Sequence, residues 1–215
     1  MPIAMRVAAL LLAASLYSNV QAADWGPLSR AKALEQAKSG QIDKRRLAYG
    51  RLAEVGTPED VPVLLAALWD EEALIRGMAE QAVWGIWMRT DDPAADPMFQ
   101  TGIQLLTEDK PEQALETLNQ VIALKPEFAE AWNRRGDAYQ LMGDEERALA
   151  DYEHVLRLNV FHFGTLESCG KIWLERGNYR AAAEYFRRAL DINPNLWNVA
   201  DILQRLEKSL ENDRI

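Results

Sequence analysis

The sequence is poor in the residues that carry most covalent and metal chemistry. Its 215 residues include one cysteine, Cys169, and two histidines, His154 and His162. One cysteine excludes a disulfide within the chain, and two histidines are too few for most zinc sites unless carboxylates complete the ligand set. The sequence also lacks a phosphate-binding glycine loop, a nucleophile elbow, and the His-Glu-x-x-His and Cys-x-x-Cys motifs. We therefore expect no catalytic residues, no metal and no cofactor, and predict that the protein is not an enzyme.

Positive charge is also in deficit. The chain has 24 Lys and Arg against 33 Asp and Glu, a formal net charge of −9. Proteins bind nucleic-acid backbones mainly through Lys and Arg side chains, which displace counterions from the phosphates. This chain has an excess of negative charge, so we expect no nucleic-acid partner. The composition, 48% hydrophobic and 27% charged, is that of a folded globular chain.

A long membrane-spanning run is missing as well. One apolar run, Val7 to Leu16, follows Arg6, and it is too short for a bilayer that needs about 20 apolar residues. The run precedes Val20-Gln21-Ala22, which has small residues at the positions that a signal peptidase reads. We predict a signal peptide over residues 1–22, cleaved after Ala22, and a bacterial protein that is periplasmic or secreted without stable membrane insertion.

What the chain does contain is a repeat. Gly102, Gly136 and Gly170 are spaced 34 residues apart, and three further columns of small or large apolar residues follow the same spacing. In a pair of packed helices, small residues allow close approach and large apolar residues fill the space that remains. The three further columns are Ala114, Ala148 and Ala182; Leu118, Tyr152 and Phe186; and Leu105, Tyr139 and Trp173.

This period and this order of residues resemble the tetratricopeptide repeat. The resemblance implies three helix pairs, over residues 95–128, 129–162 and 163–196. Within the pairs, Gly143 and Gly177 suit the left-handed residue that ends a helix, and Asp144 and Asn178 suit the N-cap of the next helix. Between pairs, Pro126 and Pro194 stop a helix, whereas Val160 stands at the equivalent position of the second repeat. We therefore expect the segment 159–164 to turn differently.

A second, weaker pattern precedes the first. Arg45 and Arg76, Ala48 and Ala79, and Val55 and Ile86 are each 31 residues apart. The stretch Val61 to Ile86 resembles a short HEAT-like repeat, and its apolar spacing of three and four predicts two amphipathic helices. We expect about two such helix pairs within residues 23–90. The inward-facing side chains would be Val61, Leu64, Leu65 and Leu68 on one helix, and Ile75, Ala79, Ala82, Val83 and Ile86 on the other.

The remaining segments connect and close the arrays. Residues 91–96 read as a linker, in which Asp96-Pro97 forms the N-cap and first turn of the next helix. Residues 197–215 read as a capping helix and tail, because repeat arrays need a final helix with a polar outer face. The fold class we predict is all-α: a superhelical solenoid of HEAT-like helix pairs, then three tetratricopeptide repeats, then the cap.

The resemblance to tetratricopeptide repeats also implies a function. In such arrays the first helices line a concave groove that binds an extended or helical peptide. We predict a non-catalytic scaffold or assembly factor of the cell envelope that binds a protein or peptide. Residues 95–196 hold 17 acidic and 11 basic residues, which favours a partner with an apolar anchor and some positive charge. The predicted groove residues are Phe99, Ile103, Leu106, Asn133, Arg134, Asp137, Gln140, Glu167, Lys171 and Leu174.

Three alternatives remain open at this stage. The first is a glycan-binding envelope protein that uses Trp25 and other exposed aromatics, although repeat columns and helical stripes assign most of the tryptophans, Trp69 and Trp197 among them, to packing. The second is an accessory of a lyase-type HEAT-repeat enzyme. The third is a catalytic pair of Cys169 and His162, seven residues apart on one predicted helical face. A basic cluster, Lys44, Arg45, Arg46 and Arg51, is either a second contact site or a solvated helix face.

Overall fold

The computed structural model describes residues 28–212. This part of the chain consists of α-helices joined by loops, from α2 to α12, with one short 3-10 turn and no strand. The all-α prediction is confirmed. No helix among these residues is both long and apolar enough to cross a membrane. The predicted signal peptide and Trp25 lie outside the described residues.

The described chain divides into two compact units, which are considered separately. One unit comprises residues 90–188 and 203–212, and the other comprises residues 28–89 together with Ala189–Ile202. The division is not sequential, because helices α11 and α12 each contribute residues to both units.

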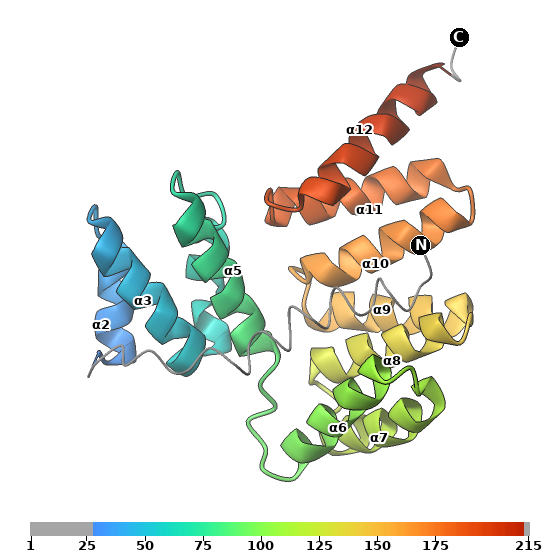
Figure 1. Cartoon of the computed structure of the whole chain (residues 1–215), viewed down its shortest axis with the longest axis horizontal. Helices are drawn as coiled ribbons and strands as arrows, with labels where there is room; N and C mark the ends of the chain where they lie inside the picture. The colour runs from blue at the N-terminus through green and yellow to red at the C-terminus, as the bar shows by residue number, and fades with distance from the viewer. Residues whose placement is uncertain (1–27, 213–215) are drawn as a thin grey trace. The chain divides into compact units, whose positions relative to one another are not determined.

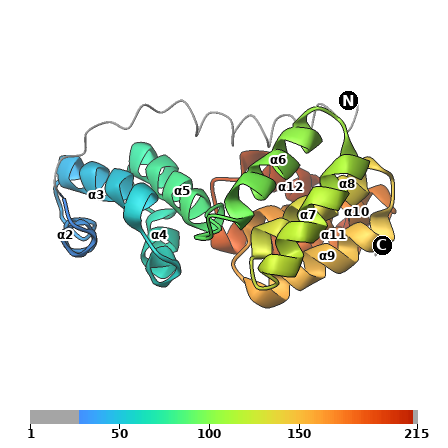
Figure 2. The same cartoon turned by 90° about the horizontal axis from the view of Figure 1, so that it is seen from below.

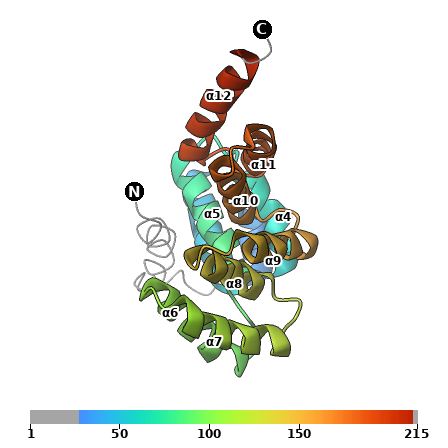
Figure 3. The same cartoon turned by 90° about the vertical axis from the view of Figure 1, so that its right-hand side faces the viewer.

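The first unit contains the 34-residue repeat. Helices α6, α8 and α10 each have 13 residues, and each begins 34 residues after the one before; α7, α9 and α11 each have 14 and follow the same spacing. Helices adjacent in sequence pack side by side (Figures 1 and 3). The helices span Ala95–Thr107 (α6), Pro111–Leu124 (α7), Ala129–Leu141 (α8), Glu145–Leu158 (α9), Phe163–Glu175 (α10) and Tyr179–Ile192 (α11).

In every repeat the glycine of the first helix faces a large apolar side chain of the second. A Cβ atom placed on Gly136 would lie 2.5 Å from the ring of Tyr152, and one placed on Gly170 would lie 2.5 Å from the ring of Phe186. In the first repeat the partner of Gly102 is Leu118, at 2.9 Å. The large side chain in each repeat therefore occupies the volume that a side chain on the first helix would need, as the column pattern predicts.

The turns within the repeats also follow the sequence. Gly143 and Gly177 have φ angles of +76° and +73°, the left-handed conformation that glycine adopts without strain. Asp109, at the equivalent position of the first repeat, has a φ of +56°. The side chain of Asp144 caps α9 by accepting from the amide of Arg147, and that of Asn178 accepts from the amide of Ala181 at the start of α11.

The connection between the second and third repeats corrects one expectation. The amide of His162 donates to the carbonyl of Asn159, as the amide of Phe128 does to Lys125 one repeat earlier. The turn is therefore the same with Val160 as with Pro126. A proline suits this position but is not required there, because the turn does not depend on the locked φ angle.

The start of α6 corrects a second expectation. The helix begins at Ala95, before the predicted cap, Asp96. The side chain of Asp92 accepts from the amides of Ala94 and Ala95, at 2.8 and 3.1 Å. Asp92 thus satisfies the first free amides of the helix, and Asp96 lies inside the first turn, where an acidic residue interacts favourably with the helix dipole.

The second unit contains two shorter helix pairs, α2 with α3 and α4 with α5. Helix α3 packs between α2 and α5, and α4 packs against α5 (Figures 1 and 2). Thr57 and Asp60 form a capping box around the 3-10 turn Pro58–Asp60 that leads into α4. The predicted inward residues are buried, except that Leu65 is half-buried. The helices span Arg30–Gln36 (α2), Ile42–Val55 (α3), Val61–Ala67 (α4) and Ala73–Trp87 (α5).

Arginines tie the layers of the second unit together. Arg45 donates to the carbonyl of Ser39 at 3.1 Å and to the carboxylate of Asp70 at 3.1 Å. Arg76, 31 residues later, donates to the carbonyl of Asp70 at 2.9 Å and to the side-chain oxygen of Asn195 at 2.7 Å. Each arginine therefore binds the loop before its own helix and also a side chain of another loop of the same unit.

The final helix, α12, spans Trp197–Asn212. Within the first unit, Arg187 of α11 and Glu207 of α12 form an ion pair at 2.6 Å. Val199, Leu203 and Leu206 are buried, which gives the helix the apolar inner face that the sequence pattern predicts.

Candidate protein-binding surface

The predicted groove residues lie on the first helices of the repeats, α6, α8 and α10. The structure divides them into a buried set and an accessible set. Phe99 and Leu106 are 0% and 2% exposed, and Asn133 and Arg134 are 5% and 6% exposed. These four correct the expectation that all ten side chains face a ligand. The other six are half-buried and define what we call the first-helix surface: Ile103, Asp137, Gln140, Glu167, Lys171 and Leu174.

Each buried side chain has a local partner that accounts for its position. The rings of Phe99 and Phe128 pack edge to face with centroids 4.8 Å apart. Arg134 forms ion pairs with Glu130 at 3.2 Å and with Asp137 at 3.1 Å. The repeat resemblance therefore placed all ten residues on the first helices, but it did not separate the buried side chains from the accessible ones.

A buried polar network lies beneath the first-helix surface, where α8 meets the start of α10. Glu130 is 1% exposed and His162 is 0% exposed, and the Nε2 atom of His162 lies 2.5 Å from Oε1 of Glu130. The hydroxyl of Thr165 donates to the side-chain oxygen of Asn133 at 2.8 Å, and Asn133 donates to Glu130 at 3.3 Å. The network joins the second repeat to the third through hydrogen bonds between residues 32 apart in sequence.

The hydrogen bonds assign the tautomer of His162. Its Nδ1 atom accepts from the backbone amide of Thr165 at 3.0 Å and so caps the N-terminus of α10. An accepting Nδ1 carries no proton, and the ring proton is therefore on Nε2, directed at Glu130. His162 thus acts as a neutral N-cap and as a donor to a carboxylate.

Electrostatics keeps Glu130 ionised inside the protein. Burial opposes its ionisation, but the positive charge of Arg134 and the contact with His162 outweigh burial and lower the pKa of Glu130 from 4.5 to about 2. Asp137 behaves in the opposite way, since burial raises the pKa of its carboxyl despite the charge of Arg134. Asp137 also accepts a hydrogen bond from the buried hydroxyl of Tyr152, at 2.8 Å.

Sequence reasoning missed this network, although one signal for it was present. His162 stands 34 residues after Phe128 and 34 before Leu196, in a column that is otherwise apolar at these positions. A polar residue in an apolar repeat column requires a buried hydrogen-bond partner, and Glu130 is that partner.

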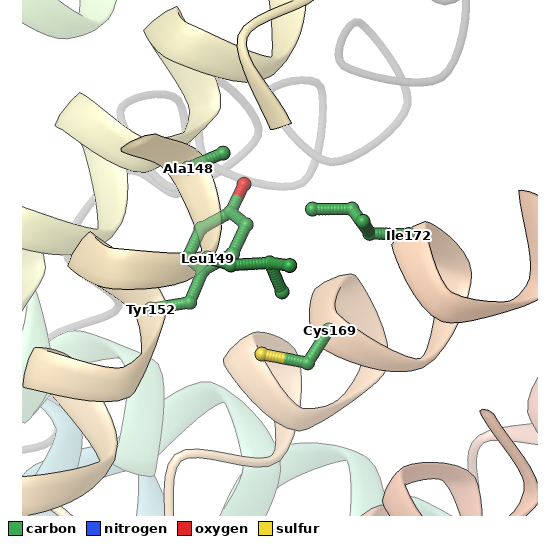
Figure 4. Packing of buried hydrophobic residues seen from close by; sticks show 5 residues of the cluster. All are labelled: Ala148, Leu149, Tyr152, Cys169 and Ile172. Atoms are coloured by element: carbon green, nitrogen blue, oxygen red, sulfur yellow. The ribbon is translucent and has the colours of Figure 1, made fainter. Parts of the chain in front are cut away.

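Cys169 and His162 do not form a catalytic pair. Cys169 is 0% exposed and packs between α9 and α10 against Ala148, Leu149, Tyr152 and Ile172 (Figure 4). Burial raises the pKa of its thiol to about 12, so the thiol is not a nucleophile near neutral pH. The hydrogen bonds above direct both ring nitrogens of His162 to Glu130 and Thr165.

The two most exposed tryptophans correct the assignment of these residues to packing. Trp69 is 61% exposed and Trp197 is 71% exposed, whereas Trp84, Trp87, Trp132 and Trp173 are half-buried. Two members of the basic cluster differ from a solvated helix face. Arg45 is bonded as above, and Arg51 donates to the carbonyl of Leu28 and to Glu54. Neither arginine is a simple solvated residue.

Two other features carry no chemistry. In residues 28–212, no group of three or more His, Cys, Asp or Glu side chains is placed to hold a metal ion. A shallow hollow of about 370 Å³ lies beside the turn between α8 and α9 and is lined by residues that include Glu145, Glu146 and Arg176. Arg176 pairs with both carboxylates at 2.7 and 3.0 Å, which links the second repeat to the third.

Comparison with known sequences places the repeats in a family. Residues 129–160 and 165–196 match the description "Tetratricopeptide repeat", and residues 109–143 match "TPR repeat". A TPR repeat-containing protein of Rhizobium etli is 30% identical over 128 residues, which cover 60% of this chain and 63% of the relative. Human superkiller complex protein 3 is 38% identical over 85 residues, 38% of this chain and 5% of that protein.

A subunit of a complex is also similar. Anaphase-promoting complex subunit 3 of Schizosaccharomyces pombe is 31% identical over 83 residues, 39% of this chain and 12% of that subunit. The chain therefore spans less than two thirds of the length of each of these relatives. The solved structure of MamA has a TM-score of 0.44 at 22% identity and covers 73% of this chain and 91% of that one. The three family matches, taken with the helix register, show that the chain carries tetratricopeptide repeats, a class that generally mediates protein–protein interaction.

Proposed function

We propose that this protein is a non-catalytic scaffold or assembly factor of the bacterial cell envelope, and that its first-helix surface binds a segment of another protein. The observation that carries the proposal is the register of the three first helices. Because α6, α8 and α10 repeat at a constant spacing, their six half-buried side chains recur on one face of successive helices.

The chemistry of this surface indicates what it would bind. Ile103 and Leu174 offer apolar contacts, and Asp137, Gln140 and Glu167 offer acceptors. Glu167 is paired with Lys171 within α10, and Asp137 is paired with Arg134 within α8, so a cationic ligand would share these carboxylates with the partners that they already have. Acidic residues exceed basic ones over the three repeats. We therefore infer a protein partner with an apolar anchor and Lys or Arg side chains.

Site-specific photo-crosslinking in cells tests the surface. A photoreactive amino acid at Gln140 samples the first-helix surface, and one at Gln120 is a matched control, since it replaces the same residue type at an exposed position on the second helix α7. We expect one distinct envelope protein to be captured from Gln140 and not from Gln120. Equal capture at both positions, or capture from neither, would count against the proposal.

Export is tested separately. Cleavage after Ala22 would leave Ala23 as the first residue of the mature protein. We expect N-terminal sequencing of protein from the periplasmic or secreted fraction to begin at Ala23. A protein that keeps Met1 and fractionates with the cytoplasm would contradict the envelope part of the proposal but leave the binding surface unaffected.

A further inference from the structure

The two most exposed large hydrophobic side chains of the described residues are indoles of the second unit. Trp197 is 71% exposed and Trp69 is 61% exposed, and Leu74, five residues after Trp69, is 52% exposed. An indole buries a large apolar area when it packs, so leaving two of them in water is unfavourable unless something covers them.

One asparagine holds together the two chain segments that carry the indoles. The side-chain nitrogen of Asn195 donates to the carbonyl of Leu68 at 2.8 Å, and its side-chain oxygen accepts from Nε of Arg76 at 2.7 Å. Trp69 follows Leu68 directly, and Trp197 is two residues after Asn195. Both tryptophans are therefore within two residues of a single hydrogen bond, although they are far apart in the sequence.

Hydrogen bonds order the backbone next to both indoles. Around Trp69, Arg76 binds the carbonyls of Asp70 and Glu71, at 2.9 and 3.0 Å. Near Trp197, the side chain of Asn193 accepts from the amide of Asn195 at 3.0 Å, and the carbonyl of Asn195 accepts from the amide of Trp197 at 2.9 Å. A surface whose backbone is already ordered loses little entropy when it binds.

The charge around the pair is mostly negative. Residues 68–76 carry Asp70, Glu71 and Glu72 against Arg76, and residues 191–201 carry Asp191 and Asp201 with no basic residue. Glu71, Glu72 and both of the latter aspartates are exposed. Indole faces attract cations, and nearby carboxylates strengthen that attraction.

We propose that Trp69 and Trp197 form a second docking surface, and that its occupant is a lysine- or arginine-rich segment of a protein. Cationic side chains would lie over the indole faces while the surrounding carboxylates offset their charge. The charge complementarity favours this occupant over a neutral glycan, which indoles also bind by stacking. The surface belongs to a different unit from the first-helix surface and does not depend on it.

Binding of a fluorescein-labelled lysine–glycine peptide to the purified protein tests the proposal, with fluorescence anisotropy as the readout. Anisotropy of the peptide avoids the background of the seven tryptophans. We expect the Trp69→Ala/Trp197→Ala double variant to weaken binding about tenfold, and added salt to weaken binding to the parent protein. The matched control is Phe161→Ala, which removes a 46% exposed aromatic from the first unit and should leave the affinity unchanged.

A second variant separates the indoles from net charge. Glu71→Gln/Glu72→Gln keeps both tryptophans, and we expect it to weaken peptide binding as well. If the tryptophan double variant binds the lysine–glycine peptide as the parent does, net charge alone holds the peptide and the proposal fails. If the indoles are needed instead for a neutral envelope polysaccharide, and not for the peptide, the surface is a glycan site and the proposal is again overturned.

Discussion

The two units pack helix pairs by different contacts. In the tetratricopeptide unit, a glycine of each first helix faces a large side chain of its second helix, as Gly136 faces Tyr152, and helix lengths are constant. In the other unit, Gly85 of α5 faces backbone: a Cβ atom on Gly85 would lie 3.0 Å from the carbonyl oxygen of Ala53. Its helices range from 7 to 15 residues, and arginines bonded to loop carbonyls join its layers.

The difference explains why the sequence pattern of one unit is strong and that of the other is weak. A side-chain interlock requires a specific residue type at a fixed offset, and so it leaves columns in the sequence. An arginine that binds carbonyls requires nothing of the residue that supplies the carbonyl. The second unit can therefore keep its packing while its partner residues vary, and the HEAT-like resemblance of residues 28–88 stays a prediction.

The largest expected effect comes from breaking the interlock. Gly136→Leu would place a side chain where the ring of Tyr152 already lies, and we expect the free energy of unfolding to fall by about 3 kcal/mol or more. Thermal unfolding followed by circular dichroism measures this loss of stability. The control is Gly77→Ala in α5, where no atom lies within 4 Å of the new Cβ, so stability should rise by about 0.5 to 1 kcal/mol. An unchanged melting temperature for Gly136→Leu would refute the helix register.

The next effect concerns the buried charge of Glu130. Because its pKa is lowered from 4.5 to about 2, ionised Glu130 contributes stability above about pH 4.5 that is lost as the pH falls towards 2. We expect Glu130→Gln to lose roughly 2 to 3 kcal/mol near pH 7, and its stability to change less between about pH 5 and pH 2 than that of the parent. Urea unfolding across this range measures both curves.

Asp137 also contributes to that comparison. Burial raises its pKa, and so does the charge of Glu130, so Asp137 acts with the opposite sign and favours folding as the pH falls. Because Glu130→Gln removes that charge, the difference between the two curves reports on Glu130 together with its coupling to Asp137. Parallel curves for the parent and the Gln variant would show that Glu130 is not held ionised by Arg134 and His162.

A smaller effect is expected in the second unit. Arg76→Ala removes hydrogen bonds to two loop carbonyls and to Asn195, and we expect a loss of about 1 to 2 kcal/mol. Hydrogen exchange should also become faster in residues 68–72. Arg46→Ala is the control, because Arg46 and its partner Asp43 are 46% and 82% exposed and such pairs contribute little. Equal exchange in both variants would contradict the role of Arg76.

The smallest effect is at a helix cap. Asp144→Ala removes the side chain that accepts from the amide of Arg147, and we expect a loss of about 1 kcal/mol. Gln41 is the N-cap of α3 and makes no side-chain cap bond, so Gln41→Ala should change stability by less than about 0.5 kcal/mol. If chemical unfolding gives the same small change for both, the cap bond of Asp144 contributes nothing measurable.

The sequence predicted the parts of the fold that depend on residue type at fixed spacing. The glycine and aromatic columns, the left-handed Gly143 and Gly177, and the caps at Asp144 and Asn178 are all confirmed. For the candidate site, the helix face was predicted from the repeat resemblance, and whether the six accessible side chains bind a partner stays a prediction.

The errors share a physical cause. Phe99 was predicted at the surface because Phe128, whose ring packs against it, is far away in the sequence. Trp69 was predicted in the core as a continuation of the helical pattern, but α4 ends at Ala67, two residues before it. Both depend on neighbours beyond the local spacing. The Glu130–His162 contact depends on residues 32 apart, and it could have been anticipated only from the polar exception in an apolar column.

The bonds that Asn195 makes have a consequence for how the chain folds. They join residues 119 and 127 positions apart, whereas the repeats between them are built from near neighbours. Contacts between nearby residues form quickly, and contacts across long loops form late. The helix pairs that leave the ribosome first therefore complete their own unit last, once the segment Ala189–Ile202 has been made. A chain that ends before Ala189 would carry its repeats but leave its earliest helices unfinished.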